Sequence, residues 1–215
     1  MFGISDGLVS NTSLILGIAG ASSAAGIVRL AGLAGLFGGA FSMAAGEYIS
    51  MRAQSELFQR EIEIERKEIG RHPEGEHREL VHLYERRGMP AELARQVADE
   101  MMSDPELALE THAREELGID PGSTGKPIQA AVSSFVTFAV GAFMPLLPFL
   151  FSSGTTATLS AVAIAGLSAL VVGGLLSIFT GRDWWFSALR QLFICAVAGA
   201  ITYGIGSAIG VSGVA

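Results

Sequence analysis

The sequence predicts an all-α membrane protein with five transmembrane helices and a helical cytoplasmic insert between the second and third of them. Two observations predict this fold. First, 29 of the 35 charged residues lie between Arg52 and Lys126, whereas a soluble protein would spread its charges over its whole surface. Second, the flanking segments are apolar and rich in glycine and alanine, and small residues let membrane helices approach closely. The flanks therefore suit lipid, and the middle of the chain suits water.

The lengths of the apolar segments set the number of spans. A bilayer core about 30 Å thick needs roughly 20 apolar residues per helix. Residues 4–25 and 30–51 supply one span each. Residues 127–181 carry no charge and are long enough for two spans, divided at 152–156, and residues 184–215 supply the fifth.

The second helix has an unusual exit from its apolar part. That part ends near Met51, but no helix breaker follows before Pro73, and residues 52–70 are good helix formers. One long helix should therefore leave the membrane and continue into water. This gives three segments along the chain: 1–51 with membrane helices one and two, 52–126 as the charged insert, and 127–215 with membrane helices three to five.

Three shorter helices are expected in the rest of the insert. The first two cover residues 74–88 and 91–102. The third begins with Asp104 as its N-cap and Pro105 as its first helical residue, and it ends at Gly118.

The positions of Lys and Arg predict the orientation. The insert holds 11 of the 14 basic residues and should be cytoplasmic. The loop between helices four and five carries Arg182 and Arg190, and with five spans it falls on the same side. The N-terminus should then lie inside and the C-terminus outside.

Composition argues against several classes of protein. A net charge of −7 is inconsistent with a nucleic-acid-binding protein, which needs a basic face. No serine–histidine–aspartate arrangement, phosphate-binding glycine loop or CxxC motif suggests an enzyme, and no prosthetic group is expected. Glu79-x-x-His82 has the spacing of a di-iron site, which leaves ferroxidase activity as a remote alternative. Cys195 is expected to be an inert apolar residue.

Two carboxylates within the apolar segments are the candidates for transport, because ionisable groups inside a bilayer are costly and mostly functional. They are Asp6 in helix one and Glu47 in helix two. Met43, Glu47 and Met51 share a helical face at i, i+4 and i+8, and thioethers favour softer transition metals. In the alternative interpretation, the methionines only fill space and Glu47 points to water.

The insert contains two pairs of carboxylates at i, i+3 spacing, Glu65 with Glu68 and Glu76 with Glu79. Each pair shares a helix face, and the turn at Pro73 would bring the two faces together. Four carboxylates so close repel each other and favour a cation. A further helix could add His112 and Glu116 as ligands. The alternative is a solvated acidic surface, which is the commoner role of glutamate-rich helices.

Two apolar motifs, SDGLVSNTSLILGIAGA at 5–21 and GGAFSMAAGEYISMRAQSE at 38–56, resemble those of the vacuolar iron transporter family. The insert motif QREIEIERKEI, the MPLLPF stretch and the five-helix layout resemble it too. The resemblance implies export of Fe²⁺, and often Mn²⁺, from the cytoplasm in exchange for protons. It also implies a homodimer with its pore between the first helices, in a bacterial inner membrane or a vacuolar membrane.

The same resemblance implies roles for individual residues. The pore aspartate falls on Asp6, and the pore methionine falls on Met43. The metal-binding glutamates of the cytoplasmic domain fall on these positions: Glu65, Glu68, Glu76, Glu79 and Glu116. The chain departs from some members at Gly35, where they have a glutamate, and at His112 and Ala113, where they have methionines.

We therefore expect a divalent-metal/proton antiporter whose partners are metal ions, protons, lipid and a second copy of the chain. Carboxylate-rich sites discriminate by geometry, so Fe²⁺, Mn²⁺, Zn²⁺ and Co²⁺ all remain candidates. One alternative is a membrane-anchored iron buffer or sensor that binds metal without moving it. Another is a passive membrane protein with a solvated acidic stalk.

Overall fold

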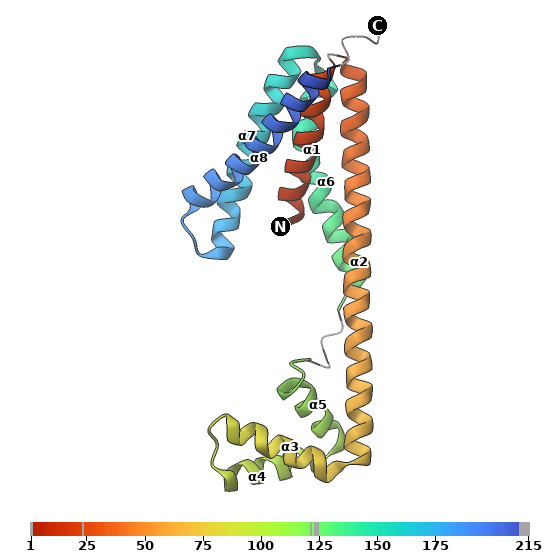
Figure 1. The fold of residues 1–215 in the computed structure, drawn as a ribbon, viewed down its shortest axis with the longest axis vertical. Coiled ribbons are helices and arrows are strands. Elements are labelled where there is room, and N and C mark those ends of the chain that lie inside the picture. The colour runs from red at the N-terminus through yellow and green to blue at the C-terminus, as the bar shows by residue number, and fades with distance from the viewer. Residues whose placement is uncertain (1, 23, 121, 123–124, 211–215) are drawn as a thin grey trace. The chain divides into compact units, whose positions relative to one another are not determined.

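The computed structural model describes residues 2–22, 24–120, 122 and 125–210, and all regular elements within these ranges are helices (Figure 1). The chain forms two compact units, divided between Tyr48 and Ile49 and again between Pro127 and Ile128. We call the part outside these limits the apolar unit and the part between them the acidic unit. The helices are α1 (Phe2–Ala21), α2 (Ala25–Arg71), α3 (Pro73–Arg86), α4 (Ala91–Met101), α5 (Pro105–Glu115), α6 (Pro127–Phe151), α7 (Gly154–Thr180) and α8 (Trp184–Ile209).

Helix α2 runs unbroken from Ala25 to Arg71 and so belongs to both units. This confirms the long continuous helix predicted from the lack of a breaker before Pro73. Helix formers carry it past Met51, and ion pairs between side chains one turn apart, such as Arg52 with Glu56 at 2.7 Å, add to its exposed surface.

In the apolar unit, α1 packs against α6, α7 and α8 through small residues. A Cβ placed on Gly7 would lie 2.1 Å from the carbonyl oxygen of Phe138, and one on Gly141 would lie 2.1 Å from that of Ile4. The backbones of α1 and α6 therefore touch, and only glycine fits at these two positions. On α7, small residues recur every fourth position and are buried, as in other closely packed membrane helices: Ala157, Ala161, Ala165, Ala169, Gly173 and Ser177.

Four helices in the described part of the chain, α2, α6, α7 and α8, are long and apolar enough to cross a membrane. The prediction of five spans is thus supported for four of them. Helix α1 is not among these four, and its 20 residues include Asp6, Asn11, Thr12 and several serines. Asn11 and Thr12 are buried against neighbouring helices, so α1 fits a place inside a helical bundle better than one facing lipid.

The end of α6 carries two prolines. The sequence predicts that Pro145 and Pro148 kink or unwind this helix. The helix does not unwind, since α6 continues through both prolines to Phe151, and both are buried. Its last turn is capped from outside, because the Arg29 guanidinium donates to the carbonyl oxygen of Phe149 and the Ser152 hydroxyl donates to that of Pro148. Such partners are required where no water reaches the backbone.

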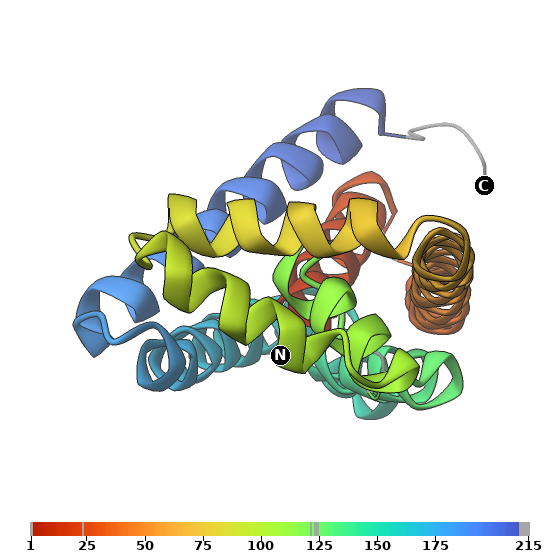
Figure 2. The same cartoon turned by 90° about the horizontal axis from the view of Figure 1, so that it is seen from below.

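In the acidic unit, α3 and α4 pack side by side and α5 follows (Figure 2). The predicted cap of α5 is confirmed, since the Asp104 carboxylate accepts hydrogen bonds from the backbone nitrogens of Glu106 and Leu107, both at 3.0 Å. This helix ends at Glu115 and not at Gly118 as predicted. A small apolar core holds the helices together: Leu80, Leu83, Ala94, Ala98, Ala108, Leu109 and Ala113.

Candidate metal-binding sites

The acidic unit brings several predicted ligands together around His112. The Nδ1 atom of His112 lies 3.3 Å from Oε1 of Glu65, 3.7 Å from Oε2 of Glu76 and 3.5 Å from Oε2 of Glu116. The fifth member, Glu79, lies within hydrogen-bonding reach of Glu116. We call these five residues the acidic cluster, and within it one ligand atom each from Glu65, His112 and Glu116 falls inside a 4.8 Å span.

Three helices position the cluster. Glu65 lies on the last part of α2, and Pro73 then opens α3 at a position where its missing N–H costs nothing. Glu76, one turn into α3, thereby faces Glu65. His112 and Glu116 sit at i, i+4 at the end of α5, so they project from the same side of that helix.

The cluster contains buried polar atoms that lack a partner. His112 is 1% exposed, and its Nε2 atom has no hydrogen-bond partner among the described residues. The same holds for Oε1 of Glu65, which has no hydrogen bond of acceptable geometry within the described chain although Nδ1 of His112 is near. Buried polar groups are nearly always satisfied, because leaving one unpaired costs free energy. A cation between the carboxylates and Nδ1 of His112 would satisfy the unpaired oxygen of Glu65, whereas Nε2 of His112 points away from that position.

The electrostatics of the acidic cluster also favour a bound cation. Burial raises the pKa of Glu65 to about 7, and the charges of Glu76, Glu116 and Glu79 add to that rise. The pKa of Glu79 is also raised, first by the charge of Glu116 and then by burial. Without a cation, the cluster therefore retains protons that exposed carboxylates would lose. With a divalent cation, the ionised forms become favourable again.

Metal affinity of the protein should rise steeply with pH around neutrality. A carboxylate ligand must lose its proton to bind, and Glu65, with its pKa near 7, is still largely protonated at pH 6. We expect Fe²⁺ or Mn²⁺ to bind weakly at pH 6 and tightly at pH 8, with proton release on binding. Calorimetry in buffers of different ionisation enthalpy measures both quantities. Affinity independent of pH over this range would exclude Glu65 as a ligand.

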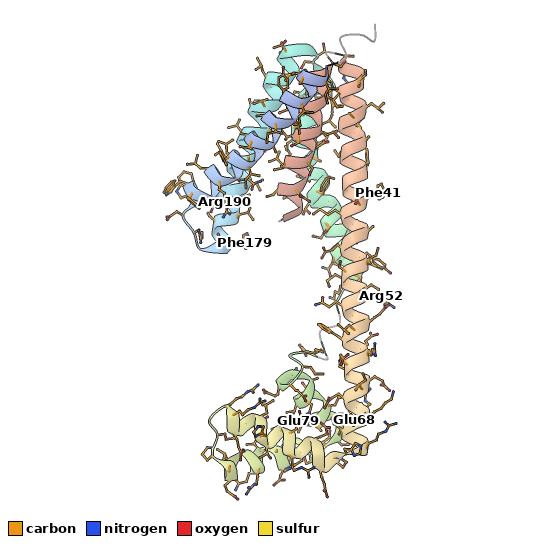
Figure 3. The ribbon with its side chains drawn as sticks, viewed as in Figure 1. Phe41, Arg52, Glu68, Glu79, Phe179 and Arg190 are labelled. Atoms are coloured by element: carbon orange, nitrogen blue, oxygen red, sulfur yellow. The ribbon has the colours of Figure 1, made fainter. Side chains whose placement is uncertain are left out.

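Some predicted or possible ligands lie outside the cluster. Glu68 is half-buried on α2, and its side chain forms no ion pair with any described residue. Figure 3 labels Glu68 on α2 and the cluster member Glu79 on α3. The predicted role of Glu68 as a ligand rests on the sequence. His82 is 70% exposed and lies 4.0 Å from Glu85, so it does not form the di-iron pair with Glu79 that its spacing allowed.

In the apolar unit, the predicted Asp6 and Met43 line one groove of about 300 Å³ between α1 and α2. Glu47 is exposed one turn beyond Met43 and is not among the residues that line this groove. Met51 lies in the acidic unit, where its methyl group is close to Gly125. The sequence did not single out most of the other residues along the groove, several of which are polar: Ser10, Asn11, Leu14, Gly35, Gly39, Ser42 and Phe138.

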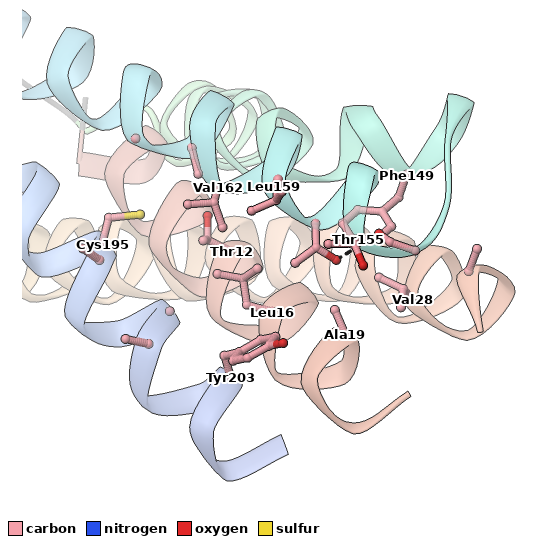
Figure 4. Close-up of a pocket in the computed structure, with 18 of the residues that line it drawn as sticks. Thr12, Leu16, Ala19, Val28, Phe149, Thr155, Leu159, Val162, Cys195 and Tyr203 are labelled. Atoms are coloured by element: carbon pink, nitrogen blue, oxygen red, sulfur yellow. Dashed lines mark hydrogen bonds between the residues drawn. The ribbon is translucent and has the colours of Figure 1, made fainter. Parts of the chain in front are cut away.

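A larger cavity of about 570 Å³ lies on another side of α1, against α7 and α8 (Figure 4). Its described lining residues are mostly apolar and include no charged side chain. Cys195 and Thr12 line it, and both are buried. A lone thiol among apolar groups makes a poor site for a divalent cation, so the groove that holds Asp6 is the better candidate.

Comparison with known proteins identifies the family. The sequence profile of the VIT family matches residues 1–207. The vacuolar iron transporter of Acanthamoeba castellanii is 36% identical over 93% of this chain and 76% of its own length. Vacuolar iron transporter 1 of Oryza sativa subsp. japonica is 31% identical over 97% of this chain and 83% of its own, and its Arabidopsis thaliana namesake is 29% identical over 94% and 82%. The family indicated by the motifs is confirmed, and the chain belongs to the VIT family.

Proposed function

We propose that this protein exports Fe²⁺ from the cytoplasm in exchange for protons, with Mn²⁺ and related divalent ions as further substrates. The observation that carries the proposal is the groove between α1 and α2, where a carboxylate and a thioether, Asp6 and Met43, line the same surface. The names of the relatives, vacuolar iron transporters in plants and an amoeba, support iron as the substrate.

The ligand types explain both selectivity and exchange. A thioether favours softer or borderline transition metals over Mg²⁺ and Ca²⁺, and a carboxylate supplies charge. The Asp6 carboxylate can hold a proton or take part in binding a metal ion, but it does not readily do both. Ion release and proton uptake at one group would therefore couple the two fluxes. Glu47 is the second candidate for the proton carrier.

A second copy of the chain would complete the pathway. Asp6 is exposed on the surface of the apolar unit, and an exposed carboxylate is costly in lipid. If the same groove of a second subunit faces it, the two carboxylates and two thioethers enclose a polar path between the α1 helices. A homodimer with α1 as its fifth membrane helix therefore accounts for the exposed carboxylate of Asp6 on α1.

The acidic unit would serve as the cytoplasmic collector of ions. Its many Lys and Arg residues favour the cytoplasmic side of the membrane. Its cluster offers carboxylates and an imidazole to Fe²⁺. Binding there raises the local supply of metal for transport. The cluster alone would also suit an iron buffer or sensor, which is the second candidate function.

Reconstitution of the full-length protein into liposomes separates these functions. We expect anaerobic Fe²⁺ to cross the membrane and to drive protons the opposite way, at a rate that an imposed pH gradient changes. Mn²⁺, Co²⁺ and Zn²⁺ added as competitors would establish the selectivity order. A buffer or sensor would bind metal in stoichiometric amounts without accumulation in the lumen, and that result would contradict transport.

A further inference from the structure

The strongest feature that the proposed function does not explain is the side-chain amide of Asn11 on α1. Its Nδ2 atom donates a hydrogen bond to the backbone carbonyl oxygen of Ala142 on α6, at 2.6 Å. Only the nitrogen end of an amide can donate to a carbonyl, so this bond fixes which end is which. The Oδ1 atom is left as an acceptor on the opposite side, and it accepts no hydrogen bond from any described residue.

This oxygen is both buried and unpaired. Asn11 is 1% exposed, and the side chain cannot rotate to find a donor without breaking its bond to Ala142. An unpaired buried acceptor costs free energy that a leucine at the same place would not. An acceptor kept at such a cost, beside a groove that already holds Asp6, points to a positively charged occupant.

Gly35 on α2 makes room for this oxygen. A Cβ placed on Gly35 would lie 2.6 Å from Oδ1 of Asn11 and 2.5 Å from a methyl carbon of Leu14. Any larger residue would therefore press on the oxygen. A glycine in the interior of a helix is less stabilising than an alanine. Glycine is nevertheless present at position 35, where Oδ1 of Asn11 approaches α2.

Asn11 lines the same groove as Asp6 and Met43. Gly32 on α2 packs against Ile15 on α1, and Gly35 on α2 packs against Asn11 on α1. The residue numbers rise along α2 while they fall along α1, so the two helices are antiparallel. Asn11 is five residues after Asp6, which corresponds to roughly 7 Å along the helix axis at 1.5 Å per residue. The groove therefore has two positions, one at Asp6 with Met43 and one at Asn11 with Gly35.

We propose that Oδ1 of Asn11 is a ligand for the transported divalent cation, at a second position beyond Asp6 and Met43. This inference rests on the proposed function and deepens it. A neutral amide oxygen binds a cation more weakly than a carboxylate, which suits an ion that must leave again. Leu14, 38% exposed, also lies against Gly35, and its side chain would rotate away when the ion arrives.

Two substitutions approach the same oxygen from different helices. Asn11→Leu removes it from α1, and Gly35→Ala places a methyl group against it from α2. Two matched controls are available. Thr12→Val alters a buried polar residue next along α1 that lines the other cavity, and Gly38→Ala adds the same methyl group to α2 where no atom lies within 4 Å.

Initial rates of anaerobic Fe²⁺ uptake into proteoliposomes, measured over a range of metal concentrations, test the proposal. We expect both Asn11→Leu and Gly35→Ala to lower kcat/KM by about tenfold or more, the range for losing one bond to a charged group. The two controls keep wild-type values. Thermal unfolding in detergent shows which variants are folded, and if Asn11→Leu is not, Gly35→Ala decides.

Two other results would be informative in different ways. If folded Asn11→Leu and Gly35→Ala proteins keep the wild-type kcat/KM while Asp6→Ala is inactive, Asn11 only joins α1 to α6 and the inference is overturned. The inference is overturned in the same way if Asn11→Leu alone loses rate together with stability and Gly35→Ala is normal. If the wild-type protein itself accumulates no Fe²⁺ in the lumen, the proposed function fails, whereas wild-type rates in Asp6→Ala remove only the role of Asp6.

Discussion

Replacement of Asp6 by alanine is expected to reduce metal-driven proton flux to the level of protein-free liposomes. Asp6 is the one carboxylate among the described residues that line the groove, so its loss removes both the charge that attracts the cation and the group that exchanges it for a proton. Metal uptake and proton movement should therefore fall together. Both are measured in the same proteoliposomes, with a metal-sensitive dye and a pH-sensitive dye inside.

Two companion variants sharpen the result. Asp6→Asn keeps an oxygen ligand but cannot carry a proton, so any residual metal flux should lose its dependence on the pH gradient. Glu47→Gln changes an exposed carboxylate one turn beyond Met43 and outside the groove. If Glu47→Gln abolishes coupling and Asp6→Ala does not, Glu47 is the proton carrier, and unchanged flux in Asp6→Ala removes Asp6 from the mechanism.

The sequence predicted those parts of the fold that depend on local chemistry. Helix α2 continues past Met51 because helix formers follow and no breaker intervenes before Pro73. Asp104 caps α5 because its short carboxylate reaches the free backbone nitrogens at the start of that helix. Four of the apolar segments follow from length and composition alone.

Side-chain spacing was less informative about which carboxylates meet. Glu65 and Glu68 are three residues apart, so their directions differ by about 60° around the helix. That difference is enough to bury Glu65 against His112 while Glu68 remains half-buried outside the cluster. Likewise Met43 and Glu47 share a helical face, yet only Met43 lines the groove with α1.

Asn11 could not have been identified from the sequence. A single asparagine in an apolar helix has no periodic signal, and its importance depends on the carbonyl oxygen of Ala142, 131 residues further along the chain. Gly35 likewise gains its meaning only from the oxygen opposite it. The only available hint was that two polar residues follow Asp6 on the same helix. Ser10 lies about one turn after Asp6, and Asn11 lies about one and a half turns after it.

Replacement of Glu65 by glutamine should have opposite effects with and without metal. Above pH 7, in the absence of a cation, Glu65 is ionised while buried near Glu76, Glu79 and Glu116, and this repulsion destabilises the acidic unit. Its folded-state pKa is raised above the unfolded value, so the native state binds more protons, and stability falls as the pH rises from about 4.5 to 7. Glu65→Gln removes this loss, and the metal-free variant should unfold at a higher temperature than wild type at pH 8.

With metal present the order should reverse. A ligand at 100 times its Kd stabilises a folded protein by about 2.7 kcal/mol, and weakening a metal site by 10- to 100-fold cancels roughly half or more of that gain. We therefore expect Mn²⁺ to raise the unfolding temperature of the wild-type protein strongly and that of Glu65→Gln only slightly.

Glu63→Gln is the matched control, since Glu63 is exposed on the same helix and pairs with Arg66 and Lys67 at 3.6 and 3.3 Å. A solvated acidic surface would attract cations through its total charge, and both substitutions reduce that charge equally. Equal metal responses in Glu65→Gln and Glu63→Gln would therefore mean that the acidic cluster does not hold the ion.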